Sequence, residues 1–413
     1  MLNSKYISYL IITITVLAFS ETSAFSAVSI GDIDVSLSSS TGIALNDSLV
    51  IKNHNYASWT GIANTTFSIS SSYSINSVED ISGNNSDYDR FSFEDLSFAM
   101  PFGNGHIFGF SYYPAAVSDI SGVSGPELVE NSFEEAVSRT LETKKGSISN
   151  ASLIYGKHFS GFAFAADASF KFGNYNRTKR YNYTSVSETY LTDNYFEERE
   201  ITQISHFTLG SGVIYDHSSG LSFGAKISLP VSSSGTGIYQ FDRTTSYGSV
   251  LEKIYENTGG LSVVEWPVEY GAGLGYRTSG FVFSYDFVLK KFDGLKTGID
   301  DTAMSDYYRH VIGLRYAPRQ RRYDPYLKRM AYSGYLTIEK RPFDYNGNPV
   351  FDTTGTLGLN FPFNNDRTNV EIKFSYIRSG SVSDNALEGN TFRMQFNFIS
   401  SDSWWLKKEK YND

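Results

Sequence analysis

Apolar and polar residues alternate along most of this chain. From about residue 64 onward, short segments place apolar side chains at every second position, as half-buried β-strands do. In the last segment the apolar positions are Phe392, Met394, Phe396 and Phe398, and the polar positions between them are Arg393, Gln395 and Asn397. The period of two predicts an all-β chain built from consecutive strands.

We count about fourteen such segments, most of them near the 9–11 residues that a tilted strand needs to cross a bilayer. The predicted strands cover residues 64–75, 91–102, 105–114, 146–158, 161–173, 202–216, 220–232, 265–277, 280–290, 306–317, 329–341, 351–363, 368–379 and 390–400. Strands of soluble β-sandwiches average five or six residues, so the length favours a transmembrane antiparallel β-barrel over a sandwich.

The connections between these segments alternate in length. Short ones follow the second, fourth, sixth, eighth and twelfth segments. Long ones lie between them near residues 76–90, 115–145, 174–201, 233–264, 291–305, 342–350 and 380–389. Outer-membrane barrels have tight periplasmic turns and longer outer loops. One connection at the short-turn end is an exception, because Pro318–Lys328 is long and basic. An even strand number predicts that both chain ends lie in the periplasm.

Composition supports this prediction and excludes several kinds of protein. The 413 residues are 16% aromatic and only 19% charged, and they include no cysteine, so disulfides, thiolate metal sites and thiol catalysis are impossible. A net charge of -9 gives no electrostatic basis for nucleic-acid binding. The few charges on polar strand faces are expected to pair across a lumen; they are Asp167, Lys226, Asp286, Arg315, Glu371, Lys373 and Arg393.

Both ends of the chain differ from the strand region. Lys5, the apolar run Tyr9–Phe19 and the small residues Thr22-Ser23-Ala24 predict an export signal over residues 1–24. Residues 401–413 form a predicted periplasmic tail in which Trp404-Trp405 anchor at the membrane interface. The expected location is the cell outer membrane of a Gram-negative bacterium.

Residues 25–62 do not alternate and precede the first strand. They contain Gly42–Ser48 and then Asn53-His54-Asn55-Tyr56-Ala57-Ser58-Trp59, which resembles the N-terminal plug of the FadL-type long-chain fatty acid transporters. The usual asparagine-proline-alanine phrase lacks its proline here, so Asn53 or Asn55 takes the asparagine position and Ala57 the alanine position. Phe98–His106 resembles the second hairpin of that family.

The resemblance implies a fourteen-stranded barrel over residues 63–400 with a plug made from residues 25–62. It also implies passive uptake of hydrophobic compounds such as fatty acids: capture in an outer groove, rearrangement of the plug and lateral exit through the wall. The expected partners are a hydrophobic small molecule, outer-membrane lipid and, during biogenesis, the barrel assembly machinery. The barrel itself is expected to be a monomer.

One long connection carries apolar residues at three- and four-residue spacing, which predicts an amphipathic helix between Pro126 and Gly146. Its apolar face either lines a ligand groove or packs against neighbouring loops. With the plug residues, it completes the predicted ligand-binding and plug set: Asn53, Asn55, Ala57, Trp59, Leu128, Val129, Phe133, Val137 and Leu141.

No catalytic, cofactor or metal motif accompanies these features. The six histidines lack any metal-ligand spacing, and no G-x-S-x-G is present, so we expect no enzyme, no cofactor and no metal. The alternating Gly271, Gly273 and Gly275 predict close approach of a neighbour. Three alternatives to uptake stay open: a non-transporting adhesin or structural barrel, a barrel lipase or protease that uses His106 or His158, and a general porin.

Overall fold

The computed structural model describes residues 40–46, 51–80, 83, 85–123, 127–130, 135–185, 194–245, 250–258, 265–292, 305–318, 324–345, 347–363, 367–385 and 387–402. The predicted export signal and the Trp404-Trp405 pair lie outside these residues. The same is true of residues 25–39 and 47–50 of the predicted plug.

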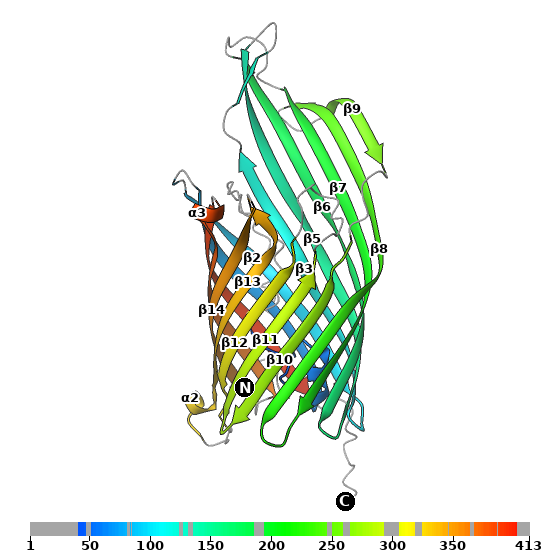
Figure 1. The fold of residues 1–413 in the computed structure, drawn as a ribbon, viewed down its shortest axis with the longest axis vertical. Coiled ribbons are helices and arrows are strands. Elements are labelled where there is room, and N and C mark those ends of the chain that lie inside the picture. Colours follow the sequence, from blue (N-terminus) through cyan, green and yellow to red (C-terminus); the bar gives the residue numbers. More distant parts are fainter. Residues whose placement is uncertain are drawn as a thin grey trace, which may run out of the picture.

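Long antiparallel strands make up nearly all of the described chain (Figure 1). In chain order the elements are η1 (Tyr56–Gly61), β1 (Thr65–Asp80), β2 (Asn85–Pro101), β3 (His106–Val123), β4 (Glu127–Glu130), β5 (Glu135–Phe159), β6 (Phe162–Ser185), β7 (Asn194–Asp216), β8 (Leu221–Thr245), β9 (Val250–Thr258), β10 (Val268–Thr278), β11 (Phe281–Lys291), β12 (Tyr307–Tyr316), α2 (Tyr326–Arg329), β13 (Ala331–Tyr345), β14 (Asn348–Phe363), β15 (Thr368–Ser381), α3 (Val382–Asn385) and β16 (Leu387–Asp402). Within the described residues, no helix is long and apolar enough to cross a membrane.

Fourteen of the strands close into a ring. Each ring strand pairs with the next along the chain, β16 pairs with β1, and the lower half of β8 pairs with β10. The short strands β4 and β9 lie outside the ring and extend its wall by pairing with β5 and β8. The fourteen-stranded antiparallel barrel expected from the sequence is confirmed.

The two faces of the wall differ as the alternation predicts. On β16, Phe392 and Phe398 are 48% and 42% exposed on the outer face, whereas Gln395 and Asn397 are each 8% exposed on the inner face. The same division holds around the ring, so the exterior is an apolar surface rich in Phe, Leu, Ile and Tyr. The interior is lined by Ser, Thr, Asn and charged residues.

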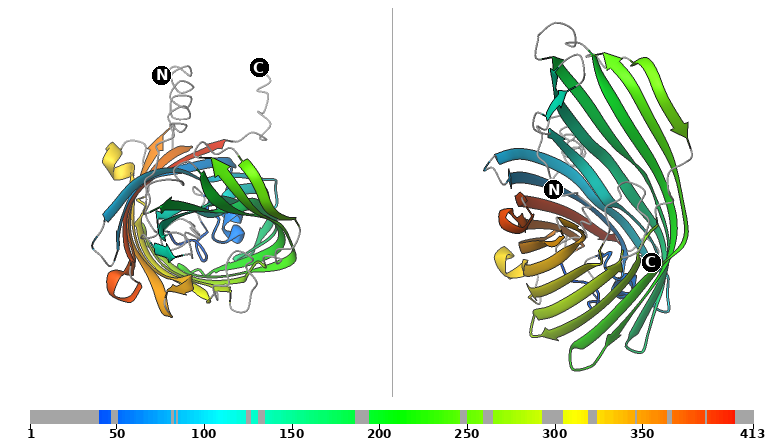
Figure 2. Two further views of the ribbon diagram at one scale, coloured as in Figure 1. Left: turned by 90° about the horizontal axis from the view of Figure 1, so that it is seen from above. Right: turned by 45° about the horizontal axis from the view of Figure 1, so that its top comes forward.

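Tight turns join the strands at the end of the barrel where β1 begins and β16 ends. Ser160-Gly161 and Ser279-Gly280 have positive φ at both residues, which is the type I′ geometry that suits the twist of two-residue hairpins. The long connection at this end contains α2, which lies outside the ring of strands (Figures 1 and 2).

At the opposite end, the wall rises much higher on one side (Figure 1). Strands β5 to β8 are 23–25 residues long, roughly twice the predicted length. Much of the connections predicted at 115–145, 174–201 and 233–264 is therefore strand. Sequence alternation fails here because the residues are polar on both faces, while the backbone hydrogen bonds of the sheet continue regardless of side-chain pattern.

The helix predicted between Pro126 and Gly146 is wrong over the described residues. This stretch forms β4 and the first part of β5, and Leu128 pairs with Val137 while Val129 pairs with Ala136. The apolar residues that mimic a helical stripe are cross-strand partners in a hairpin. Residues of β5 also pair with β6 on the other side, so two neighbouring strands satisfy the backbone there.

The prediction of a long connection at residues 342–350 is also wrong. Strand β13 reaches Tyr345 and β14 begins at Asn348, so only two residues separate the strands. The dipeptide Asn-Gly at residues 346 and 347 is the strongest sequence signal for a two-residue hairpin, and it agrees with this short connection.

We predict that the apolar exterior of the ring faces hydrocarbon. Leu357→Arg on β14, where the native side chain is 68% exposed, should lower the free energy of unfolding from lipid bilayers by about 2–4 kcal/mol. Denaturant titration of bilayer-inserted protein measures the change. Leu251→Arg is the control, because Leu251 is 52% exposed on β9, outside the ring. Equal losses from both variants would contradict a lipid-facing exterior.

Candidate functional site

An N-terminal segment, residues 40–46 and 51–62, lies inside the ring of strands (Figure 2, left). Asn55 organises it by capping η1, since its Oδ1 accepts a hydrogen bond of 3.1 Å from the N–H of Ala57. Its Nδ2 lies 2.9 Å from the carbonyl oxygen of Ile43 and 3.3 Å from that of Val213 on β7. One side-chain amide therefore ties together the two parts of the segment and the wall.

Trp59 anchors η1 to the wall. Its side chain is 1% exposed, and its Nε1 donates a 2.8 Å hydrogen bond to the carbonyl of Lys52. Around it the inner face of β2, β3 and β5 to β7 is aliphatic instead of polar, with Ala99, Ile107, Ile154, Ala163, Ala165 and Ile214 in one buried cluster with Ile51, Ala57, Trp59 and Ile62. The wall is apolar on its inside where this segment covers it.

Glycines in the wall receive the first part of the segment. A Cβ on Gly273 would come within 2.9 Å of the Ala44 nitrogen, and one on Gly275 within 2.7 Å of Leu45 Cδ2. A Cβ on Gly224 of β8 would overlap the Ile43 carbonyl. The alternating glycines of β10 thus provide the close approach expected from the sequence, and the neighbour they admit is residues 43–45.

Asp286 of β11 holds the same residues by charge-assisted hydrogen bonds. Its Oδ2 accepts the backbone N–H of Gly42 at 2.6 Å and that of Ile43 at 3.1 Å, and the side chain is 1% exposed. The hydroxyls of Thr41 and Ser284 lie 2.5 Å apart beside this contact. Together these bonds seat residues 41–43 against β11.

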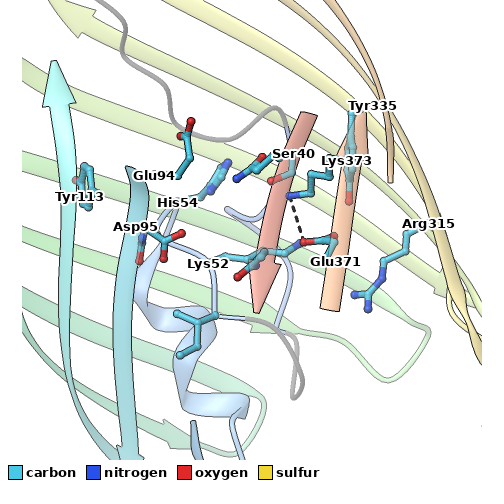
Figure 3. Close-up of a pocket in the computed structure, with 14 residues that line it drawn as sticks. Ser40, Lys52, His54, Glu94, Asp95, Tyr113, Arg315, Tyr335, Glu371 and Lys373 are labelled. Carbon is cyan, nitrogen blue, oxygen red and sulfur yellow. Dashed lines mark ion pairs between the residues drawn. The ribbon is translucent and has the colours of Figure 1, made fainter. Parts of the chain in front are cut away.

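A charged cavity lies on one side of the segment (Figure 3). Acidic Glu94, Asp95 and Glu371 and basic Lys52, Arg315 and Lys373 all line it. Lys373 Nζ lies 3.3 Å from Glu371 Oε2. The balance of charges makes this cavity suited to water and small polar solutes.

A second cavity, with aromatic rings in its lining, lies on the other side. Tyr56, Tyr113 and Trp266 contribute rings to its lining, and Lys171 Nζ lies 5.2 Å from the centre of the Trp266 ring. Asp167, Lys226, Glu269 and Lys290 line it as well, and both lysines pair with Glu269. Tyr113 and Trp266 also pack against a buried apolar cluster of the inner wall made of Ala115, Ile148 and Ile204.

His54 lines both cavities. Its side chain is 2% exposed, and neither ring nitrogen has a hydrogen-bond partner in the structure. Burial holds the pKa of His54 well below its ordinary value of 6.5, and the positive charges of Arg309, Lys226, Lys52 and Lys373 lower it further. The imidazole is therefore neutral at physiological pH.

The pairing between β2 and β3 stops part-way up the wall. Leu96–Pro101 pair with Ile107–Tyr112, and within the described residues 85–123 the strands make no pair beyond Leu96 and Tyr112. From there β3 follows β5 into the extension, while β2 stays with β1 up to Asn85. At this seam the rings of Phe93 and Tyr112 lie 5.9 Å apart, and Tyr113 lines both cavities just inside it.

The structure brings together four of the predicted site residues. Asn53 lines both cavities, and Asn55, Ala57 and Trp59 are buried in the seat of η1. Leu128, Val129, Val137 and Leu141 lie instead on β4 and β5 of the extension, and Phe133 lies outside the described residues. Whether any of these nine residues binds a ligand stays a prediction.

Several residues central to this site were not predicted to belong to it. The sequence marks Asp286, Lys226 and Lys373 as isolated charges, but their observed partners are the N-terminal backbone or the wall itself: Glu269 on the adjacent strand for Lys226 and Glu371 on the same strand for Lys373. The sequence around Tyr113 and Trp266 does not distinguish these cavity-lining residues from aromatic residues at the membrane interface. Only the charge at position 286, within an otherwise apolar run, gave a usable signal.

Asp286→Ala should release residues 41–46 from the wall. A hydrogen bond to a charged group is worth about 1.5–3 kcal/mol, so exchange of the Gly42 and Ile43 amides should quicken about 10- to 100-fold. Hydrogen–deuterium exchange of the purified barrel measures this. Asp352→Ala is the control, because that buried carboxylate binds Arg341 and not the segment. Unchanged exchange in Asp286→Ala would show that the carboxylate does not hold the segment.

Acid should loosen the same segment. Because the folded protein disfavours protonated His54 and the unfolded segment does not, stability is lost as the pH falls below 6.5, by about 1.4 kcal/mol per pH unit for a strongly lowered pKa. The protection factors of the η1 amides, with the pH dependence of intrinsic exchange divided out, should therefore fall between pH 6.5 and 5 in the wild type and much less in His54→Phe. His206→Phe controls for the buried wall histidine; a pH response unaltered by His54→Phe contradicts the assignment.

Solved structures with the same fold provide the first comparison. The chain superposes on the "CymD monoaromatic hydrocarbon channel" with a TM-score of 0.58, at 12% identity, over 92% of this chain and 99% of that one. The Ralstonia pickettii toluene transporter TbuX gives 0.59, at 12% identity, over 92% and 98%. A Pseudomonas aeruginosa FadL homologue gives 0.55, at 8% identity, over 92% and 100%. The FadL-type resemblance is thus confirmed at the level of the fold.

Sequence comparisons give the family. Comparison with curated proteins finds no match. A family model named BamG matches residues 1–412, which is almost the whole chain. The chain belongs to the BamG family.

Proposed function

We propose that this protein is a passive channel for hydrophobic compounds in the outer membrane of a Gram-negative bacterium. Its fold is similar to those of barrels named as a monoaromatic hydrocarbon channel, toluene transporters and a FadL homologue. The apolar exterior supports a place in the membrane, and the tight turns at one end support a periplasmic orientation for that end. No enzymatic activity is part of the proposal.

The observation that carries the proposal is the seam between β2 and β3. Backbone groups facing lipid must be paired within the wall, so an interruption of pairing is tolerated only where it serves a cavity or is covered. The base of this seam lies at Tyr112, next to Tyr113, which lines both cavities. The seam therefore offers a short path between the interior of the barrel and the surrounding membrane.

In the proposed route a hydrophobic molecule enters from the tall outer extension. It reaches the apolar cluster around Ala115, Ile148 and Ile204 and the aromatic cavity next to it. It then leaves sideways through the seam. An apolar solute gains roughly 25 cal/mol per Å² of surface kept from water, so lateral exit is favoured over descent past the charged cavity.

The N-terminal segment acts as the plug in this proposal. It fills the lower lumen, held by Asp286, Asn55 and the seat of Trp59. A seated segment keeps ions and water from passing straight through a wide barrel. Its displacement from the wall glycines would change the shape of both cavities, since Asn53 and His54 line each of them.

A non-transporting barrel is the second candidate, and one observation favours it. Strands β5 to β8 carry a large sheet well beyond the ring, and this extension has the size of a surface that contacts other molecules outside the cell. In that case the seated segment would be a permanent seal and the seam a structural irregularity.

Locking the seam separates the two candidates. Because the chain has no cysteine, Phe93→Cys with Tyr112→Cys supplies the only thiols, and a cleavable bifunctional thiol reagent joins β2 to β3. Uptake of toluene, and in a parallel assay of oleate, into cells carrying the protein should fall at least about tenfold on cross-linking. Uptake falls because a covalent link across the seam blocks the exit of the hydrophobic molecule. Cleavage of the reagent should restore uptake.

The matched control is Leu357→Cys with Phe374→Cys, which joins β14 and β15 where they already pair. Its cross-linking should leave uptake unchanged. Uptake that neither cross-link affects, or that equals the rate of cells without the protein, would reject the channel in favour of the non-transporting barrel. A large steady conductance of the wild type in planar bilayers would indicate a general porin instead.

A further inference from the structure

The connection between β12 and β13 differs from the other connections at its end of the barrel. It carries five Lys or Arg residues and one acidic residue between Ala317 and Met330, and it contains α2. The described tight turns at this end consist of two to four small or polar residues, such as Ser160-Gly161 and Ser279-Gly280. A helix and a concentration of positive charge are not needed to join two adjacent strands.

Helix α2 carries one exposed apolar side chain, one exposed basic side chain and one half-buried basic side chain. Leu327 is 69% exposed, more than any other large hydrophobic residue that the structure describes. Lys328 is exposed beside it, and Arg329 is half-buried with its guanidinium 5.9 Å from the centre of the Tyr326 ring. Figure 2 shows the helix, in yellow, outside the ring of strands, so these side chains do not face the lumen.

Aromatic residues at the rim of the barrel fix the height of α2. The Tyr326 and Phe363 rings lie 6.3 Å apart, and the Tyr332 hydroxyl donates a 3.0 Å hydrogen bond to the Leu327 carbonyl. Phe281 and Tyr316 form a ring pair at the same end, 4.8 Å apart. Tyr and Phe collect at the boundary between hydrocarbon and headgroups in membrane barrels, so contact with this girdle places α2 at that boundary.

We propose that α2 binds an anionic phospholipid of the inner leaflet, with Leu327 against the acyl chains and Lys328 and Arg329 at the headgroup phosphate. One turn at the rim thus offers an exposed apolar side chain, Leu327, and an exposed cation, Lys328, with the Arg329 guanidinium close by. Basic side chains beside an apolar anchor favour anionic lipid over zwitterionic lipid. This site is independent of the lumen and rests on the membrane placement of the barrel, not on transport.

The test compares lipid retention by the full-length barrel. Native mass spectrometry after extraction from bilayers that contain phosphatidylglycerol and phosphatidylethanolamine measures which lipid stays bound. Lys328→Gln with Arg329→Gln should reduce the preference for phosphatidylglycerol by about 10- to 30-fold, since each cation near an anionic surface contributes several-fold. Leu327→Ser, which removes the apolar side chain without adding charge, should weaken retention of both lipids; this distinguishes a lipid from free phosphate because only the lipid has chains.

The matched control is Lys253→Gln with Lys291→Gln, which removes two exposed cations at the opposite end of the barrel. These lysines pair with Glu256 and Asp306, and their loss should leave the preference unchanged. An equal reduction in the control would show general charge attraction and overturn the site. Retention of lipopolysaccharide at α2 in place of phospholipid would also overturn it, as would an undiminished preference in the α2 variant.

Discussion

Closure of the backbone hydrogen-bond network is the constraint on which the rest of this structure depends. A wall with an apolar exterior cannot leave N–H and C=O groups open toward lipid, so the sheet must meet itself. The last strand β16 pairs with β1, and the lower half of β8 pairs with β10, bypassing β9. Because the upper half of β8 pairs with β9 instead, one strand serves both the closed ring and the open extension.

Closure also decides what the lumen contains. A fourteen-stranded ring encloses more space than wall side chains can fill, and the N-terminal segment occupies the lower part of it. The wall has adapted locally to that occupant: glycines where backbone meets backbone at residues 43–45, and aliphatic side chains where Trp59 lies. The segment and its seat are therefore matched in shape and in polarity.

The ring was predictable from the sequence because its strands alternate with a clear difference between faces. The fourteen segments, the glycine contact of β10 and the tight turns follow from local residue patterns. The extension was not predictable, because the residues that form it, such as those after Gly173, are polar on both faces and show no alternation. The helix between Pro126 and Gly146 was wrong for the opposite reason: a hairpin brought Leu128 and Val129 opposite Val137 and Ala136, and the spacing imitated a helical stripe.

The site was less predictable than the fold, since its contacts join residues far apart in the chain. Asn55 and Trp59 were found through a family phrase, but nothing local links Gly42 to Asp286 across more than two hundred positions. The seam between β2 and β3 has no sequence signature either. Both strands alternate through it, and only the register shows that their partners differ above Leu96 and Tyr112.

The distribution of polarity inside the barrel bears on which route a hydrophobic molecule can take. The lower lumen combines a seated segment with ion pairs such as Lys373–Glu371, and moving an apolar solute through it would cost the hydration of charged groups. Above the segment, Tyr113, Trp266 and the aliphatic cluster around Ile148 offer apolar surface, and the seam begins beside Tyr113. A channel built for water-soluble cargo would have the reverse order, with polar residues at an open centre and an unbroken wall. The proposed sideways route for apolar molecules rests on this observed order.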